Sequence, residues 1–279
     1  MSKRTAKRNR IIFFTLVIAI LLVIVTLIIG YTMGLRYLKR DLGDGEFIKF
    51  FGTVDGNGKP NSGKLYYSDG TRGDIDSKNS TITFTSGDVY TGDIVDLRLE
   101  GQGKMTYSNG ETYEGSYKND RPDGQGTYNF VNGDKYVGGF KDGKMHGEGT
   151  YTKADGSVYV GGFFEGMRSG KGKYTYADGS IYEGTYEKNV KQGEGRMFFA
   201  NGDVYEGQWV NDMRTGTGIY DWKESGDSYV GAFKDNLMNG WGIYTWAGGR
   251  TYEGIFENGT IVRIVNGEDE GGDVQTPAE

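Results

Sequence analysis

The residues best suited to catalysis or metal binding are few in this chain of 279 residues. His146 is the only histidine and there is no cysteine, so the sequence offers neither a histidine-based metal cluster nor the pattern of a Ser-His or Cys-His nucleophile. Residues 58–64, GKPNSGK, imitate a phosphate-binding loop, but Leu65 stands where that motif places its magnesium-binding Ser or Thr. The sequence therefore predicts a non-enzymatic protein, without a catalytic residue, a cofactor or a metal site.

Carboxylates are the other reactive groups, with 38 Asp and Glu against 32 Lys and Arg. In so acidic a chain, a pair such as Asp88 with Asp93 is expected on an exposed strand face, and we favour that interpretation over a general acid and base. A weak Ca²⁺ site stays an alternative. The N-terminal segment 1–40 carries only basic charges, so the acidic excess lies in the rest of the chain. An acidic body repels phosphate backbones, which argues against nucleic acid as a partner.

Aromatic side chains are the most plentiful groups that bind ligands, with 21 Tyr, 14 Phe and 4 Trp. On an open face such rings stack on sugars or grip an extended peptide, whereas on a closed face they form the core. A bare aromatic face along the whole chain would exceed the apolar patch that proteins tolerate in water, so most rings are predicted to be core. Trp241 and Trp246, near the end of the chain, are the candidate exposed binding aromatics.

The rings belong to a repeat. Tyr-x-Gly recurs with a constant period from Tyr90 to Tyr252, except for one longer spacing where DWKESGDSY has an extra residue. An insertion at a turn is where a repeat tolerates one. The repeat signature comprises Tyr90, Gly92, Tyr113, Gly115, Tyr136, Gly138, Tyr159, Gly161, Tyr182, Gly184, Tyr205, Gly207, Tyr229, Gly231, Tyr252 and Gly254.

Each unit alternates with a period of two, aromatic on one side and polar on the other, which predicts two β-strands. Pairs such as Asn109-Gly110 and Asn201-Gly202 lie between the two alternating runs and favour the positive φ angles of tight hairpin turns. Glycine at the centre of Tyr-x-Gly lies on the aromatic face, where a ring from the neighbouring unit is expected to cover it. One hairpin buries too little apolar surface to fold alone, so the units must stack.

These units resemble the MORN repeat family, most closely in YVGGFKDGKMHGEGTYTKADG, residues 136–156. The resemblance covers residues 86–265. It implies an all-β fold, an elongated single-layer antiparallel sheet of stacked 23-residue hairpins, used for scaffolding, membrane association or self-assembly. Contacts with phosphoinositides, reported for some members, are a weaker alternative for this acidic chain. FFGTVDGNGKPNSGKLYYSDG, residues 50–70, is an atypical first unit, and the next unit has lost its Tyr-x-Gly.

Residues 11–35 form an apolar run without a charge. As a helix of 25 residues it would span roughly 37 Å, enough to cross a bilayer core of about 30 Å. A cleaved signal peptide and a buried core helix are the alternatives, but the run is longer than a signal core and lacks a clear Ala-x-Ala site. Five Lys and Arg precede the run and three follow it, which places the N-terminus in the cytoplasm and the body outside.

The sequence thus predicts a single-pass membrane protein that uses an acidic MORN ribbon as an interaction scaffold. Its partner is expected to be another protein or a second copy, with the bilayer contacted through residues 11–35. A cell-surface module that binds glycans through exposed aromatics is the alternative. A cysteine-free body behind a short anchor favours a bacterial plasma membrane. The expected segments are a basic N-terminus 1–10, a transmembrane helix 11–35, a juxtamembrane linker 36–46, degenerate repeats 47–85, the array 86–265 and a disordered acidic tail 266–279.

Overall fold

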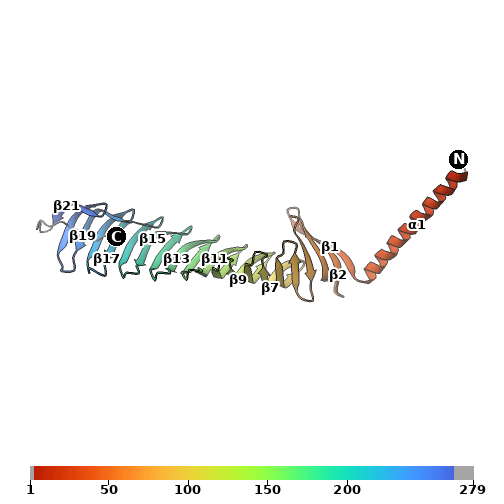
Figure 1. Ribbon diagram of the computed structural model, residues 1–279, viewed down its shortest axis with the longest axis horizontal. Helices are drawn as coiled ribbons and strands as arrows, with labels where there is room; N and C mark the ends of the chain where they lie inside the picture. Colours follow the sequence, from red (N-terminus) through yellow and green to blue (C-terminus); the bar gives the residue numbers. More distant parts are fainter. Residues whose placement is uncertain (1–2, 267–279) are drawn as a thin grey trace. The chain divides into compact units, whose positions relative to one another are not determined.

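The computed structural model describes residues 3–266, with the backbone alone described before residue 12. The chain divides into two compact units, one ending at Asp120 and the other beginning at Arg121. Figure 1 shows one helix followed by strands that succeed one another in chain order. The acidic tail predicted from residue 266 lies, beyond that residue, outside the described part of the chain.

Helix α1 covers Lys3–Thr32. Its segment Ile12–Thr32 has 21 residues and a mean hydropathy of 3.4, and none of it is buried against the protein. By length and composition this segment suffices to cross a membrane. Its threonine hydroxyls bond within the helix, as Thr26 does by donating to the carbonyl oxygen of Leu22 at 2.8 Å, so they need no water. The helix ends before the predicted boundary of 35, because Gly34 adopts a φ of 81° and strand β1 starts at Leu35.

The first unit holds eight strands that pair with their chain neighbours in antiparallel fashion. Residues 36–46, expected as a linker, are instead β1 and the turn into β2, because their side chains alternate between exposed and half-buried as in a paired strand. The strands are β1 (Leu35–Gly43), β2 (Glu46–Val54), β3 (Pro60–Tyr67), β4 (Arg72–Asp76), β5 (Thr81–Phe84), β6 (Val89–Val95), β7 (Arg98–Thr106) and β8 (Thr112–Lys118).

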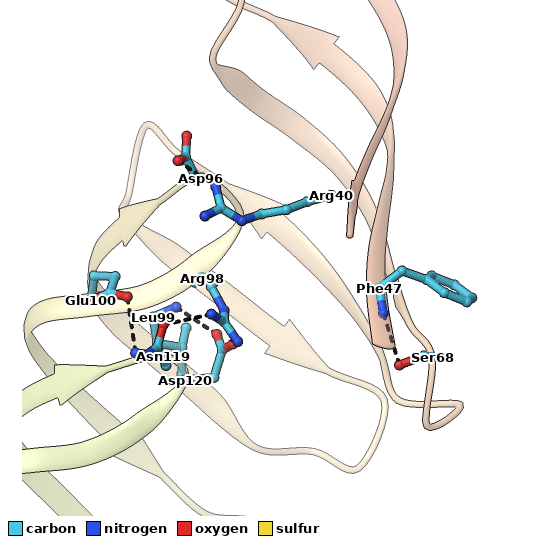
Figure 2. Close-up of polar contacts among 9 residues, drawn as sticks. All are labelled: Arg40, Phe47, Ser68, Asp96, Arg98, Leu99, Glu100, Asn119 and Asp120. Carbon is cyan, nitrogen blue, oxygen red and sulfur yellow. Dashed lines mark hydrogen bonds and ion pairs between the residues drawn. The ribbon is translucent and has the colours of Figure 1, made fainter. Parts of the chain in front are cut away.

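The degenerate repeats keep their pairing but change their core. Strands β4 and β5 are the shortest of the unit, and the buried side chains here are mainly aliphatic: Ile48, Leu65, Ile75 and Ile82, with Phe50. Arg40 of β1 forms an ion pair with Asp96, at the turn after β6 (Figure 2). Because β1 and β6 are far apart in pairing order, this contact requires the sheet to curl within the unit.

The second unit holds thirteen strands, again paired antiparallel with their chain neighbours. The expected fold class, a single-layer antiparallel sheet of hairpin repeats preceded by one helix, is confirmed. The strands are β9 (Arg121–Asn129), β10 (Lys135–Lys141), β11 (Lys144–Thr152), β12 (Val158–Phe164), β13 (Met167–Thr175), β14 (Ile181–Glu187), β15 (Val190–Phe198), β16 (Val204–Val210), β17 (Met213–Asp221), β18 (Ser228–Lys234), β19 (Leu237–Thr245), β20 (Thr251–Glu257) and β21 (Thr260–Asn266).

The tight turns lie at the opposite end of the strands from the one predicted. In the pairs predicted to form tight turns, such as Asn109-Gly110 and Asn201-Gly202, only the glycine has a positive φ; Gly110 has 93°, and its N–H bonds to the carbonyl oxygen of Tyr107 at 2.9 Å. These pairs therefore lie in loops longer than two residues, and a glycine with a positive φ closes each loop. The two-residue turns with both φ positive, as in a type I′ turn, are Asp44-Gly45, Asp96-Leu97, Asn119-Asp120, Asp142-Gly143, Glu165-Gly166, Lys188-Asn189, Asn211-Asp212, Asp235-Asn236 and Asn258-Gly259.

Lys188 sits at the first position of such a turn with a φ of 48°, a conformation that costs an L-residue roughly 1–2 kcal/mol. We therefore expect Lys188→Gly to raise the free energy of unfolding by about 0.5 to 1 kcal/mol, after allowance for the greater freedom of glycine in the unfolded chain. Thermal unfolding of the full chain in detergent measures this. Lys188→Ala is the control and should unfold as the wild type does. A glycine variant no more stable than the alanine variant would show that the turn is unstrained.

Candidate interaction face

The signature tyrosines form a buried row. From Tyr90 to Tyr229 each is at most 1% exposed. Each hydroxyl donates to a backbone carbonyl three residues later, as Tyr136 does to Gly139 at 2.9 Å and Tyr205 to Gln208 at 3.0 Å. The phenol thus satisfies its polar group inside its own repeat while the ring is removed from water. Tyr252 differs in being half-buried.

Glycine makes room for the ring. A Cβ built on Gly184 would meet the Tyr182 hydroxyl at 2.3 Å and the Cα of Gly195 at 2.7 Å. Gly184 and Gly195 face each other across β14 and β15, so one tyrosine covers both. The sequence-based expectation that the covering ring comes from a neighbouring unit is therefore wrong. The ring lies two residues before its own glycine, because side chains at i and i+2 share one face of a strand.

A second ring joins each repeat to the next. Tyr182 contacts Tyr186 of its own strand at 5.3 Å between centroids and Trp209 of the following repeat at 5.3 Å, both edge to face. Trp209 in turn contacts Tyr205, and its indole N–H donates to the carbonyl oxygen of Gly195 at 3.2 Å. Such pairs add about 0.5–1.5 kcal/mol each beyond the burial of area. In the second unit the rings involved are Tyr136, Phe140, Tyr159, Phe163, Tyr182, Tyr186, Tyr205, Trp209, Tyr229, Phe233 and Phe256.

The strand ends are fixed by side-chain bonds between repeats. Asp120 accepts the backbone N–H of Leu99 at 2.8 Å and the Arg98 Nε–H at 2.9 Å, and Asn119 donates its N–H to Glu100 (Figure 2). At the opposite ends, the residue two before a signature tyrosine accepts an N–H from the next repeat. The bonds of this second kind run from Ser108 to Asp88, Ala154 to Asp134, Ala177 to Ser157, Ala200 to Ser180, Lys223 to Asp203 and Ala247 to Asp227.

One arrangement therefore recurs from hairpin to hairpin: a tyrosine ring over two facing glycines, with side-chain bonds at the strand ends. Comparison with known protein families agrees with this repeat. The MORN repeat family model matches seven segments, residues 90–112, 113–135, 136–158, 159–181, 182–204, 205–226 and 229–249. These cover more than half of the chain. The chain belongs to the MORN repeat family. The matched segments end before Tyr252, whose repeat was also predicted from its spacing.

Other comparisons add little to the MORN assignment. The wild-type TCP10 domain of Danio rerio CPAP, in complex with a peptide of Danio rerio STIL, is 15% identical over 82% of this chain and 99% of that chain, with a TM-score of 0.43. A streptogramin B lyase structure is 14% identical over 81% and 84%, with a TM-score of 0.16. No curated protein matches the chain significantly by sequence. The assignment therefore rests on the repeats.

A second row of rings lies on the same face of the MORN array, at the end of the other strand of each hairpin or directly after it. Phe130, Tyr151, Tyr176, Phe199 and Trp222 are half-buried. Several are in contact along the row, as in Phe130 with Tyr151 at 5.6 Å and Trp222 with Tyr244 at 5.4 Å. The buried row forms the core, and this second row keeps aromatic surface in contact with solvent.

The two candidate exposed tryptophans occupy different positions. Trp241 is 48% exposed. Trp246 is half-buried, with the Arg250 guanidinium 4.2 Å above its ring and Tyr244 at 4.9 Å. Trp246 thus belongs to the second row. Ile243 and Trp241 are offset from it by an odd number of residues, so they lie on the opposite face of the sheet.

The polar candidates do not assemble into a site. Asp88 bonds to Ser108, whereas Asp93 accepts the N–H of Gln102 at 2.9 Å, so each carboxylate serves a different backbone group. The Nδ1 atom of His146 is buried without a hydrogen-bond partner among the described residues, and its ring lies 5.3 Å from Phe164. Residues 3–266 contain no group of three or more His, Cys, Asp or Glu arranged to hold a metal.

Three basic residues on this face were not predicted from the sequence. Arg168, Lys191 and Arg214 each follow a tight turn and pair in register with Phe163, Tyr186 and Trp209 respectively. Their regular offset, one per repeat, was visible in the sequence. The period-two pattern alone would not reveal them, because the bulge after each signature glycine changes which residues of the hairpin share a face.

The glycine pair beneath Tyr182 leads to a test of the array. We expect Gly184→Ala to lower the free energy of unfolding by about 2 kcal/mol, because its Cβ would displace the Tyr182 ring. Gly184→Val should lower it further. Gly248→Ala is the matched control, since its Cβ would meet no atom within 4 Å. Thermal melts of the two alanine variants that coincide would contradict this packing.

Asp88 leads to a prediction about pH. The N–H of Ser108 holds the pKa of Asp88 below its ordinary value. A carboxylate with a lowered pKa in the folded state stabilises the fold above the unfolded pKa of about 3.9, and the stabilisation is lost as pH falls below it. The melting temperature should therefore fall less between pH 5 and pH 3 in Asp88→Asn than in the wild type. Glu224→Gln, which changes an exposed loop residue, is the control. A fall as steep in Asp88→Asn as in the wild type would refute the assignment.

Proposed function

We propose that this MORN repeat protein is a non-enzymatic interaction scaffold, anchored in a membrane by α1 and binding protein through the half-buried aromatic row. The observation that carries the proposal is the division of one face into two rows. The buried row closes the core, whereas the second row keeps aromatic surface in contact with solvent, which is available to a partner. Bonds at both strand ends hold its backbone fixed, which lowers the entropy lost on binding.

Site-specific photo-crosslinking tests the binding part of this proposal. A photoreactive phenylalanine placed at Tyr176 or Phe199 in the full chain, in its native membrane, should give discrete cross-linked polypeptides. Placed at Lys173, which lies on the opposite face and pairs with Glu183, it should give none of them. Cross-links that are equal on both faces, or absent from both, would contradict the proposal.

Strand β21 favours self-association as a second kind of interaction. Among the described residues it pairs with β20 alone, and it exposes Val262 and Val265, each 52%. An open apolar edge strand is a template for pairing with another chain. A second copy of the chain presents the same edge, so an antiparallel pairing of two β21 strands is the simplest arrangement.

The proposed topology has the N-terminus in the cytoplasm and the MORN array outside. Since the chain has no cysteine, single cysteines report it without background. Ser225→Cys, at an exposed loop between β17 and β18, should react with an impermeant maleimide in intact cells. Ser2→Cys should react only after the membrane is opened. The reverse pattern would refute the orientation, and labelling of both in intact cells would refute a sealed span.

A further inference from the structure

The basic residues on the aromatic face occupy three consecutive repeats. Arg168, Lys191 and Arg214 stand at a register position that is apolar in other hairpins, where it holds Leu99, Met145, Met238 and Ile261. All three are half-buried. A stripe of cations on one face of an acidic chain is therefore specific to the repeats that begin at Tyr159, Tyr182 and Tyr205.

Each cation stacks on rings instead of pairing with an acid. The Arg168 guanidinium carbon lies 4.9 Å from the Tyr186 ring centre, Lys191 Nζ lies 4.5 Å from that of Trp209, and the Arg214 guanidinium carbon 5.2 Å from that of Tyr220. Within the described part of the chain, none of the three joins a salt bridge. Arg168 also donates one guanidinium N–H to the carbonyl oxygen of Asn189 at 2.6 Å. The rings help to hold the cations in place and leave the remaining N–H groups available to an anion.

Two of these three repeats have also lost a carboxylate. The residue two before the signature tyrosine is Ser157 and Ser180 in the repeats that begin at Tyr159 and Tyr182, whereas the repeat that begins at Tyr205 keeps an acid, Asp203, as other repeats do with Asp88, Asp134 and Asp227. Both serines keep the bond to the next repeat, accepting the N–H of Ala177 at 3.2 Å and of Ala200 at 3.0 Å. The structural bond is kept within the array while the negative charge is removed. The added basic residues and the replacement of Asp by Ser both shift the charge of this part of the face toward positive.

Lys191 is a charged group whose burial an anion would help to offset. Burial lowers the pKa of Lys191, and the positive charges of Arg168 and Arg214 act in the same direction, whereas the Asp212 carboxylate opposes them. Asp212 itself already accepts the N–H of Lys191 at 2.8 Å. A carboxylate bound at Lys191 would offset the repulsion that Lys191 feels from the two arginines.

The spacing of the cations selects a peptide conformation. Successive repeats are two strands apart, about 9 to 10 Å. A polyproline II segment has three residues per turn and a rise of about 3.1 Å, so it presents every third side chain on one side, roughly 9 Å apart. A β-strand repeats its face about every 6.7 Å and does not fit this spacing. Half-buried rings such as Tyr176 and Phe199, which lie beside the stripe, suit proline rings.

We propose that Arg168, Lys191 and Arg214 bind an acidic segment of a partner protein in the polyproline II conformation, with a carboxylate at every third residue. This inference rests on the proposed function and adds the chemistry of the partner. The guanidinium and ammonium groups bind the carboxylates, and the second aromatic row packs against the residues between them.

Peptide binding to the full chain in detergent tests the proposal. The probe is a fluorescent peptide of four Glu-Pro-Pro triplets, followed by anisotropy, and the reference peptide has the same composition with its four Glu adjacent. The spaced peptide should bind about tenfold more tightly, as expected if register alone is worth about 1.4 kcal/mol. The triple variant Arg168→Met, Lys191→Met and Arg214→Met should lose at least this factor. It should still fold, because Met145 and Met238 occupy the same position in other repeats.

The control variant removes the same charge from the other face. Lys171→Met, Lys173→Met and Arg196→Met alter exposed residues there and should change the affinity less than threefold. Equal affinity for the two peptides, or an equal loss in both triple variants, would overturn the proposal in favour of general charge attraction. Stronger retention on phosphatidylserine vesicles than on the peptide would assign the stripe to lipid. If the peptide fails while photo-crosslinks at Tyr176 persist, this inference is wrong and the scaffold stands.

Discussion

The packing of one tyrosine ring over two facing glycines is the constraint on which the rest of this MORN array depends. The ring can lie against the backbone only where both strands lack a Cβ, and its hydroxyl reaches a carbonyl three residues on only from that position. With the ring fixed, its edge is presented to aromatic side chains in two successive repeats. Burial, a satisfied polar group and contact between repeats therefore follow from a single side chain.

This arrangement leaves other positions of the repeat free to vary. The strand ends are held by backbone N–H groups that need only an oxygen acceptor, so Asp stands there in some repeats and Ser in others without loss of the bond. The position after the tight turn accepts Leu, Met, Arg or Lys. Charge on the aromatic face can thus change from repeat to repeat while the fold stays constant. That separation between a fixed core and a variable face suits a protein that binds partners along a surface.

The sequence predicts the repeat, its hairpins and the face occupied by the signature residues, because the alternation of side chains and the spacing of Tyr-x-Gly are properties of the chain alone. It does not predict which ring covers which glycine, since both the own and the neighbouring tyrosine fit that pattern. The tight turns were assigned to the wrong strand ends, because Lys188-Asn189 and Asp96-Leu97 carry positive φ angles without a glycine. Strand β1 was missed because LRYLKRDLG has basic residues typical of a membrane flank. Arg168, Lys191 and Arg214 were missed because bulges shift the alternation.

A double-mutant cycle on Tyr182 and Trp209 tests most directly whether the rings join one repeat to the next. The full chain would carry Tyr182→Leu, Trp209→Leu and both together, and the free energy of unfolding would be measured for each. The edge-to-face contact at 5.3 Å predicts a coupling energy of about 1 kcal/mol. Tyr182→Leu with Phe256→Leu, whose rings lie in non-adjacent repeats, should be additive within about 0.5 kcal/mol. Additive effects for Tyr182 with Trp209 as well would contradict this account of how the array is held together.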